Sequence, residues 1–123
     1  MIKKEFKEQL YDLVQTGVDG LDTQGVINMT RGLLLQIEKD IEYEQSNRNK
    51  SWTDEELRVV LSFPPTKENA LKLAKAFKRN YGSIEQIFRW ATTDNKEIKE
   101  KGRDEDSFIR QIKRIHKEMG WRA

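Results

Sequence analysis

Three signals that start a helix follow one another in residues 51–91, and they constrain the fold more than any other feature of this chain. Thr53 and Glu56 have the spacing of a capping box, in which each side chain accepts a hydrogen bond from the other residue's backbone N–H. Thr66 precedes a second amphipathic segment, and Ser83, with a glutamine three residues later, precedes a third. Isolated helices shorter than about 12 to 15 residues are marginal in water. We therefore predict that the three segments pack together.

The apolar residues of these segments support a trihelical bundle. They recur at positions i, i+3, i+4 and i+7, which lie on one face of a helix. The last two helices are separated by the basic, glycine-containing turn 78–82, which is the layout of a helix-turn-helix. The second segment has Ala70, Leu73, Ala74 and Phe77 at these positions, and the third has Ile84, Ile87, Phe88 and Ala91.

An antiparallel hairpin of two helices is predicted for residues 1–45. The first helix spans about residues 2–16, with Phe6, Leu10, Leu13 and Val14 on one face. The second begins after a cap at Thr23, carries Ile27, Leu34 and Ile41 at seven-residue intervals, and reaches about Glu44. The apolar stripe needs a partner, which is either the rest of the chain or a second copy in a homodimer. The polar run 45–50 is interpreted as a linker or a frayed helix end, and the domain boundary is placed there.

A final amphipathic helix is predicted for residues 104–121, packing on the bundle. Asp104 is the expected cap, with Asp106 and Ser107 as alternatives. Gly120 is expected to end the helix, and Trp121 to fold back onto its last turn. The polar stretch 92–103 is expected to be a loop or an exposed helical turn. The predicted fold class is all-α: an N-terminal helical hairpin, a trihelical helix-turn-helix bundle and a C-terminal amphipathic helix.

Several functional classes are disfavoured by composition. The chain has no Cys, which excludes thiolate metal sites and Cys nucleophiles and is typical of a reducing compartment, so we expect a cytoplasmic protein. No long apolar run indicates a signal peptide or a membrane span. His116 is the only His and has no neighbouring ligand set, and the acidic runs stand at helix starts, where dipole and capping explain them. We expect no enzymatic activity, no metal and no cofactor.

The positive charge of the chain lies in its second part. Residues 1–50 carry seven basic and nine acidic side chains, net −2, whereas residues 51–123 carry sixteen and twelve, net +4. Residues 67–92 alone hold six basic and two acidic side chains. Such a local field favours a phosphate backbone as partner, although lysines also occur on any solvated helix surface.

The turn and the third helix of the bundle contain the residues that we predict to contact double-stranded DNA. In a helix-turn-helix the second helix enters the major groove with its N-terminal part facing the base edges. Gln pairs with adenine and Arg with guanine or a phosphate, and a helix N-terminus binds phosphate. The alternative is that these residues form only a solvated face. The predicted contacts are Lys78, Arg79, Asn80, Tyr81, Ser83, Gln86 and Arg89, with a secondary basic face of Arg110, Lys113, Arg114 and Lys117.

Residues 51–91 resemble the Myb/SANT-like trihelical modules and related small helix-turn-helix domains of bacterial and phage proteins. The resemblance rests on W-T-D-E-E-L, L-A-K-A-F-K-R and G-S-I-E-Q-I, although Phe77 stands where Myb repeats favour Trp. It implies DNA binding through the third helix. The first functional hypothesis is therefore a small DNA-binding regulator or accessory factor from a bacterial, phage or mobile-element setting. The alternative is a helical protein-interaction protein, such as a phage-type inhibitor of a host enzyme or an assembly adaptor.

Overall fold

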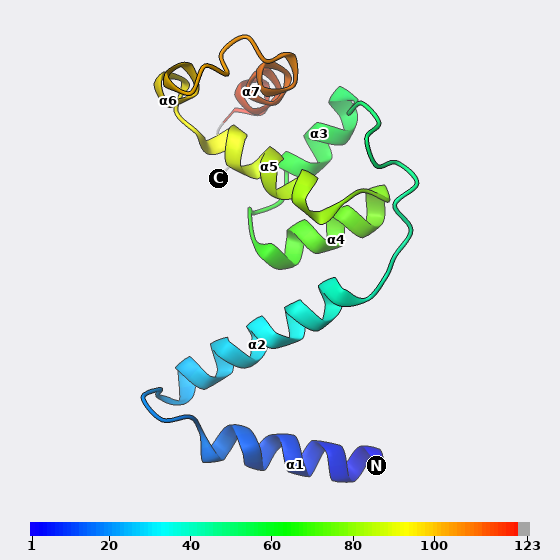
Figure 1. The fold of residues 1–123 in the computed structure, drawn as a ribbon, viewed down its shortest axis with the longest axis vertical. Helices are drawn as coiled ribbons and strands as arrows, with labels where there is room; N and C mark the ends of the chain where they lie inside the picture. Colours follow the sequence, from blue (N-terminus) through cyan, green and yellow to red (C-terminus); the bar gives the residue numbers. More distant parts are fainter. Residues whose placement is uncertain (121–123) are drawn as a thin grey trace. The chain divides into compact units, whose positions relative to one another are not determined.

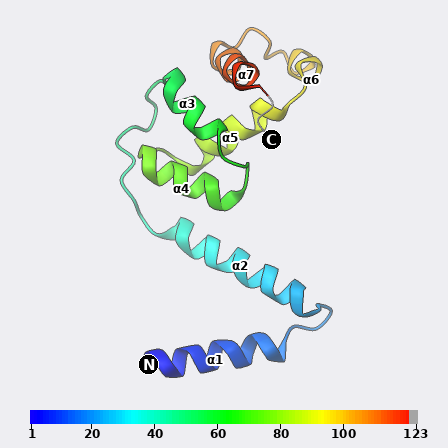
Figure 2. The same ribbon diagram turned by 180° about the vertical axis from the view of Figure 1, so that it is seen from behind.

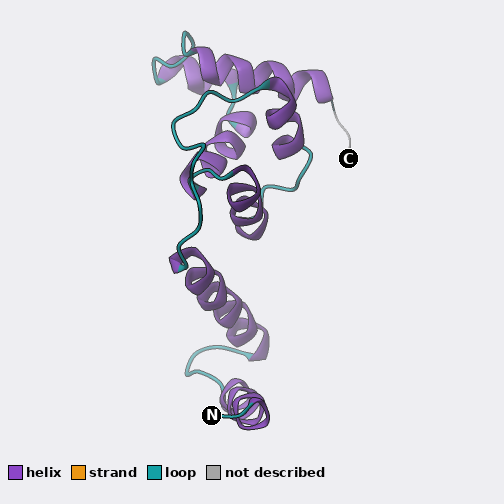
Figure 3. Cartoon of the chain, turned by 90° about the vertical axis from the view of Figure 1, so that its right-hand side faces the viewer, coloured by secondary structure: helices purple, strands orange, loops and turns teal. Residues whose placement is uncertain are grey.

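All regular structure in residues 1–120, the part of the chain described by this computed structural model, is helical (Figure 3). The predicted all-α fold is therefore confirmed. The expectation for Trp121 lies outside the described residues. The helices are α1 (Lys3–Thr16), α2 (Thr23–Asp40), α3 (Asp54–Leu61), α4 (Lys67–Phe77), α5 (Tyr81–Thr92), α6 (Asn95–Glu100) and α7 (Ser107–Met119) (Figure 1).

The chain divides into two compact units, Met1–Ile41 and Glu42–Ala123. The division comes before the polar run 45–50 that the sequence suggested as a linker. That run belongs to the second unit, because the Asn47 backbone N–H donates to the Lys78 carbonyl at 3.0 Å and the Asn47 side-chain amide donates to the Phe77 carbonyl at 2.9 Å. The linker interpretation is therefore wrong for this segment, which is hydrogen-bonded to the end of α4.

The first unit contains α1 and α2, joined by a short loop. The cap of α2 is Asp22 and not Thr23, since the Asp22 carboxylate accepts a hydrogen bond from the Gly25 N–H at 2.7 Å. Helix α2 ends at Asp40, four residues before the predicted end at Glu44. The two helices diverge away from the loop (Figures 1 and 2), α1 has no buried residue, and α2 buries only two side chains.

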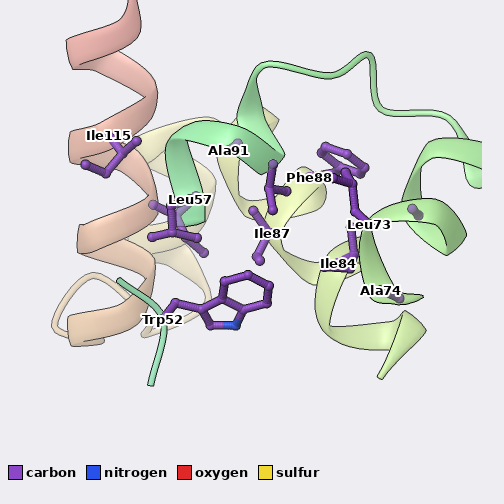
Figure 4. Close-up of a cluster of buried hydrophobic side chains, with 12 residues drawn as sticks. Trp52, Leu57, Leu73, Ala74, Ile84, Ile87, Phe88, Ala91 and Ile115 are labelled. Carbon is purple, nitrogen blue, oxygen red and sulfur yellow. The ribbon is translucent and has the colours of Figure 1, made fainter. Parts of the chain in front are cut away.

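The second unit holds a continuous apolar core built by α3, α4, α5 and α7. Helix α5 packs against α4, and α7 crosses both α3 and α5. The predicted apolar faces point inward, and Figure 4 shows Ile115 of α7 and Leu57 of α3 pointing toward each other in the cluster that also holds Ile87 of α5. The core comprises Trp52, Leu57, Val60, Ala70, Leu73, Ala74, Ile84, Ile87, Phe88, Ala91, Ile112 and Ile115.

Caps were predicted for four helices of this unit, and the predictions are confirmed for two of them. At α3 the reciprocal Thr53 and Glu56 hydrogen bonds measure 2.9 and 3.1 Å, and Thr66 caps α4 at 3.1 Å. At α5 the prediction of Ser83 is wrong, because the Asn80 side chain accepts the Gly82 N–H at 2.7 Å and the helix already begins at Tyr81. At α7 the cap is Asp106, one of the two alternatives to Asp104.

The polar stretch after α5 contains the short helix α6, capped by Asp94. Its single large apolar residue, Ile98, is buried. The burial of Ile98 explains why six otherwise polar residues hold a helix here. Helix α7 ends at Met119, and Gly120 follows as its C-cap with a φ of 63°, in agreement with the predicted glycine stop.

Arg79 links the start of α3 to the turn between α4 and α5. Its guanidinium lies 3.8 Å from the centre of the Trp52 ring and donates to the carbonyls of Lys50 and Ser51. The Glu56 carboxylate lies 3.6 Å away and neutralises its charge. Only 4% of the residue is exposed. A buried arginine with these partners is a structural element of the core, and its removal takes the donor from two carbonyls and the ion-pair partner from Glu56.

Replacing Arg79 with Ala is expected to lower the free energy of unfolding by about 3 kcal/mol, since breaking a buried ion pair on one side is strongly destabilising. Arg79→Lys is expected to lose part of this, because an ammonium cannot reproduce the forked contacts. Urea unfolding followed by tryptophan fluorescence measures the change. Arg89→Ala serves as the matched control on an exposed site and should stay within about 0.5 kcal/mol of the unmodified protein. Equal stability of the two Ala variants would contradict this assignment.

Candidate nucleic-acid interface

The face of α5 that points away from the core carries Gln86 and Arg89. The buried residues of α5 lie on one side of the helix, and both Gln86 and Arg89 are exposed on the other. They are three positions apart, so their side chains project from neighbouring turns in the same direction. Arg89 forms no ion pair within the described residues, which leaves its guanidinium open to a partner.

A shallow groove of about 170 Å³ connects this face to the start of α4. Lys67 and Arg89 line it, and Glu85 supplies one opposing charge. Lys67 is the first residue of α4, where backbone N–H groups are unpaired in the helix. Lys67 was counted in the charge of this region but was missing from the predicted contacts. Its position directly after the predicted Thr66 cap, in the first turn of a helix, is the sequence signal that could have added it to the candidate residues.

The residues at the turn between α4 and α5, which were predicted to contact DNA, also have structural roles within the protein. Lys78 ends α4 in a left-handed conformation with φ 56°, and its ammonium lies 3.5 Å from the Glu44 carboxylate. Asn80 uses its side chain as the α5 cap. Tyr81 and Ser83 are half-buried, and burial, with the charges of Glu85 and Glu68, raises the pKa of Tyr81.

Arg79 is a correction to the predicted interface. Its side chain is buried against Trp52 and its donors are directed to backbone carbonyls of the same chain. From the sequence alone, a buried basic residue in the turn of a helix-turn-helix cannot be distinguished from a basic residue that contacts a phosphate. The structure removes Arg79 from the set and leaves Gln86 and Arg89 as its exposed members on α5.

The secondary basic face lies along α7, beside an open groove of about 680 Å³ that all four of its residues line. Three of them have partners within the protein. Lys113 donates to the carbonyls of Ala91 and Thr93 at 3.3 and 2.8 Å and so caps the end of α5. Arg110 pairs with Glu105 at 3.1 Å, and Arg114 binds both oxygens of Asp54 at 2.9 and 3.1 Å. Lys117 is exposed. Lys113 therefore has a structural role at the end of α5, and the use of this basic face for a ligand stays a prediction.

Asp54 joins α3 to α7. Its carboxylate accepts hydrogen bonds from Arg114 and from the Gln111 amide, which also donates to the Trp52 carbonyl. These hydrogen bonds, first that of Arg114 and then that of Gln111, lower the pKa of Asp54 below its ordinary value. The charged carboxylate is thus favoured in the folded state.

Among residues 1–120, no group of three or more His, Asp or Glu side chains is arranged to hold a metal ion. None of the helices in that range is long and apolar enough to cross a membrane.

Asp54→Asn is expected to reduce stability at pH 7 but not in acid. A carboxyl whose folded pKa is lowered contributes stability above its unfolded pKa, about 3.9, and that contribution is lost as the pH falls through the folded pKa. The gap in unfolding free energy between the unmodified protein and the variant should therefore close below about pH 4. Urea titrations at several pH values measure it. Glu55→Gln, at an 82% exposed side chain, is the control and should show little gap; a pH-independent gap for Asp54→Asn would contradict the linkage.

The comparisons with known proteins agree on one relationship. Residues 46–123 match the family described as "Uncharacterised protein PM1205 C-terminal domain". The chain is 40% identical over 122 residues to "Uncharacterized protein PM1205" of Pasteurella multocida (strain Pm70), with 97% of each chain covered. No solved structure matches it. The family match starts within the segment that is hydrogen-bonded to the end of α4, close to the start of the second unit. The chain belongs to the PM1205 family.

Proposed function

We propose that this protein is a non-enzymatic, cytoplasmic DNA-binding protein of helix-turn-helix type, acting as a regulator or accessory factor. In this proposal α5 is the recognition helix and α4 crosses the phosphate backbone. The observation that carries it is the pair Gln86 and Arg89, which project from the outer face of α5 and take no part in the core. The resemblance of residues 51–91 to Myb/SANT-like modules belongs to the same proposal.

The chemistry of the two side chains suits base readout. A Gln amide donates to and accepts from one adenine edge, and an Arg guanidinium binds the O6 and N7 atoms of guanine or a phosphate. An α-helix fits the major groove, which is about 12 Å wide. Residues three positions apart on the outer face reach neighbouring base pairs or a base and its phosphate.

Backbone contacts in this proposal come from the start of α4. Lys67 lies on the same groove as Arg89, next to the N–H groups of the first turn of α4. Cations and helix N-termini together neutralise phosphates, and the affinity then depends strongly on salt. Lys72 and Lys75, both exposed on α4, add positive charge to this helix.

Arg89→Ala is expected to weaken binding to duplex DNA about tenfold and to reduce the salt dependence of the affinity by about one counterion. Fluorescence anisotropy with a labelled random duplex, at roughly 50 to 200 mM salt, measures both. Arg103→Ala is the matched control, because it removes the same charge from a 58% exposed side chain in the loop between α6 and α7.

The same titration decides against the proposal in two ways. An Arg103→Ala variant that loses as much affinity as Arg89→Ala shows that only net charge matters. A complete lack of binding at about 50 mM salt and micromolar protein rules out DNA as the ligand, since even non-specific binding is detectable there. The protein-interaction alternative then takes its place.

A further inference from the structure

The exposed apolar side chains of this protein are concentrated in its first unit. Of the fifteen large apolar residues that are at least 40% exposed among the described residues, thirteen lie in residues 1–41. The second unit has only Val59 and Phe63 in this class. The two units therefore differ in kind: one has a closed core, and the other presents its apolar residues to solvent.

These residues form a stripe on each helix of the hairpin. On α1, Phe6, Leu10 and Leu13 recur every three or four residues and are 58%, 40% and 68% exposed. The stripe of α2 follows the same spacing on one helix face. Its members Met29, Leu33, Leu34 and Ile37 are all more than 40% exposed, and Ile41 extends it just beyond the helix end.

Exposure of such an apolar surface to water is unfavourable unless another surface packs against it. Monomeric proteins rarely expose a contiguous apolar patch larger than roughly 300 to 600 Å². Two helices whose far ends diverge (Figure 1) bury little against each other, and units of about 40 residues usually need oligomerisation, disulfides or a metal. The chain has no Cys, which removes the disulfide route.

We propose that two copies of this chain associate through residues 1–41 and form a four-helix bundle. The area is sufficient, because about ten half-exposed apolar side chains at roughly 80 Å² each supply the 800 Å² per partner that a stable interface buries. The seven-residue spacing of Ile27, Leu34 and Ile41 is the repeat with which helices pack in such bundles.

Charge complementarity supports a second copy of this hairpin as the partner and gives the orientation of its helices. By helical spacing, Lys3 and Lys7 lie on the stripe side of α1 near its beginning, and Glu38 and Asp40 flank the stripe near the end of α2. The opposite charges at these two ends, Glu5 and Lys39, lie on the other side of their helices. When α1 of one copy runs antiparallel to α2 of the other, each basic end meets an acidic end twice, by symmetry. A parallel arrangement of the same two helices loses this match.

Self-association is independent of the proposed DNA binding, because it rests on residues 1–41 and on no residue of α5. The chain allows the two units to be observed separately. All three Trp residues lie beyond residue 42 in the sequence, so tryptophan fluorescence reports on the second unit, while far-UV circular dichroism reports on all helices.

Leu33→Glu in the full chain tests the inference. Sedimentation equilibrium of the unmodified protein at about 50 µM should give twice the chain mass, and the variant should give the single chain mass with an unchanged tryptophan emission maximum. Asn28→Glu is the matched control: it introduces the same charge at an exposed position on the side of α2 away from the stripe and should remain dimeric.

Three outcomes overturn the proposal. The unmodified protein sediments as a monomer, or it forms an assembly larger than a dimer, or Leu33→Glu stays dimeric. For the orientation, the combined change Lys3→Glu and Lys7→Glu should weaken the dimer at least tenfold, and adding Glu38→Lys and Asp40→Lys should restore it. Failure of this rescue overturns the antiparallel pairing of α1 with α2 of the second copy.

Discussion

The second unit depends on the stacking of one buried guanidinium on an indole. Arg79 leaves α4 at the turn, lies over Trp52 and binds the carbonyls of Lys50 and Ser51. The Tyr43 hydroxyl donates to the Arg79 carbonyl at 2.7 Å, so the segment before α3 is fixed to the same turn from its other side. Trp52 in turn meets Phe77 edge to face, with ring centres 5.6 Å apart. These contacts hold the segment before α3 against the turn between α4 and α5.

This arrangement determines which basic residues remain for a ligand. The core uses Arg79, and the end of α5 uses Lys113 as a cap. Arg114 is engaged with Asp54 across α3 and α7. The outer face of α5 keeps Gln86 and Arg89, and the start of α4 adds Lys67. In the proposed DNA-binding mode, the surface that contacts a phosphate backbone is therefore smaller than the whole positively charged region, and it is centred on α5.

The sequence predicts helices well and side-chain roles poorly, for physical reasons. Capping boxes and apolar spacing are local, so the starts of α3 and α4 and the core faces of α3, α4, α5 and α7 follow from the chain alone. The prediction of Ser83 as the cap of α5 was wrong because Asn80 comes first. Asn80 lies two residues after the left-handed Lys78, and its side chain accepts the Gly82 N–H. The role of Arg79 depends on Trp52, 27 positions earlier in the sequence, and no periodicity reports that contact.

The claim that the outer face of α5 is the ligand surface is tested most directly by nuclear magnetic resonance. Adding a short DNA duplex to the ¹⁵N-labelled protein should shift the amide signals of Gly82, Gln86, Arg89 and the first turn of α4, and leave those of α6 and of the hairpin in place. Shifts concentrated on α7, or on residues 1–41, would contradict the account.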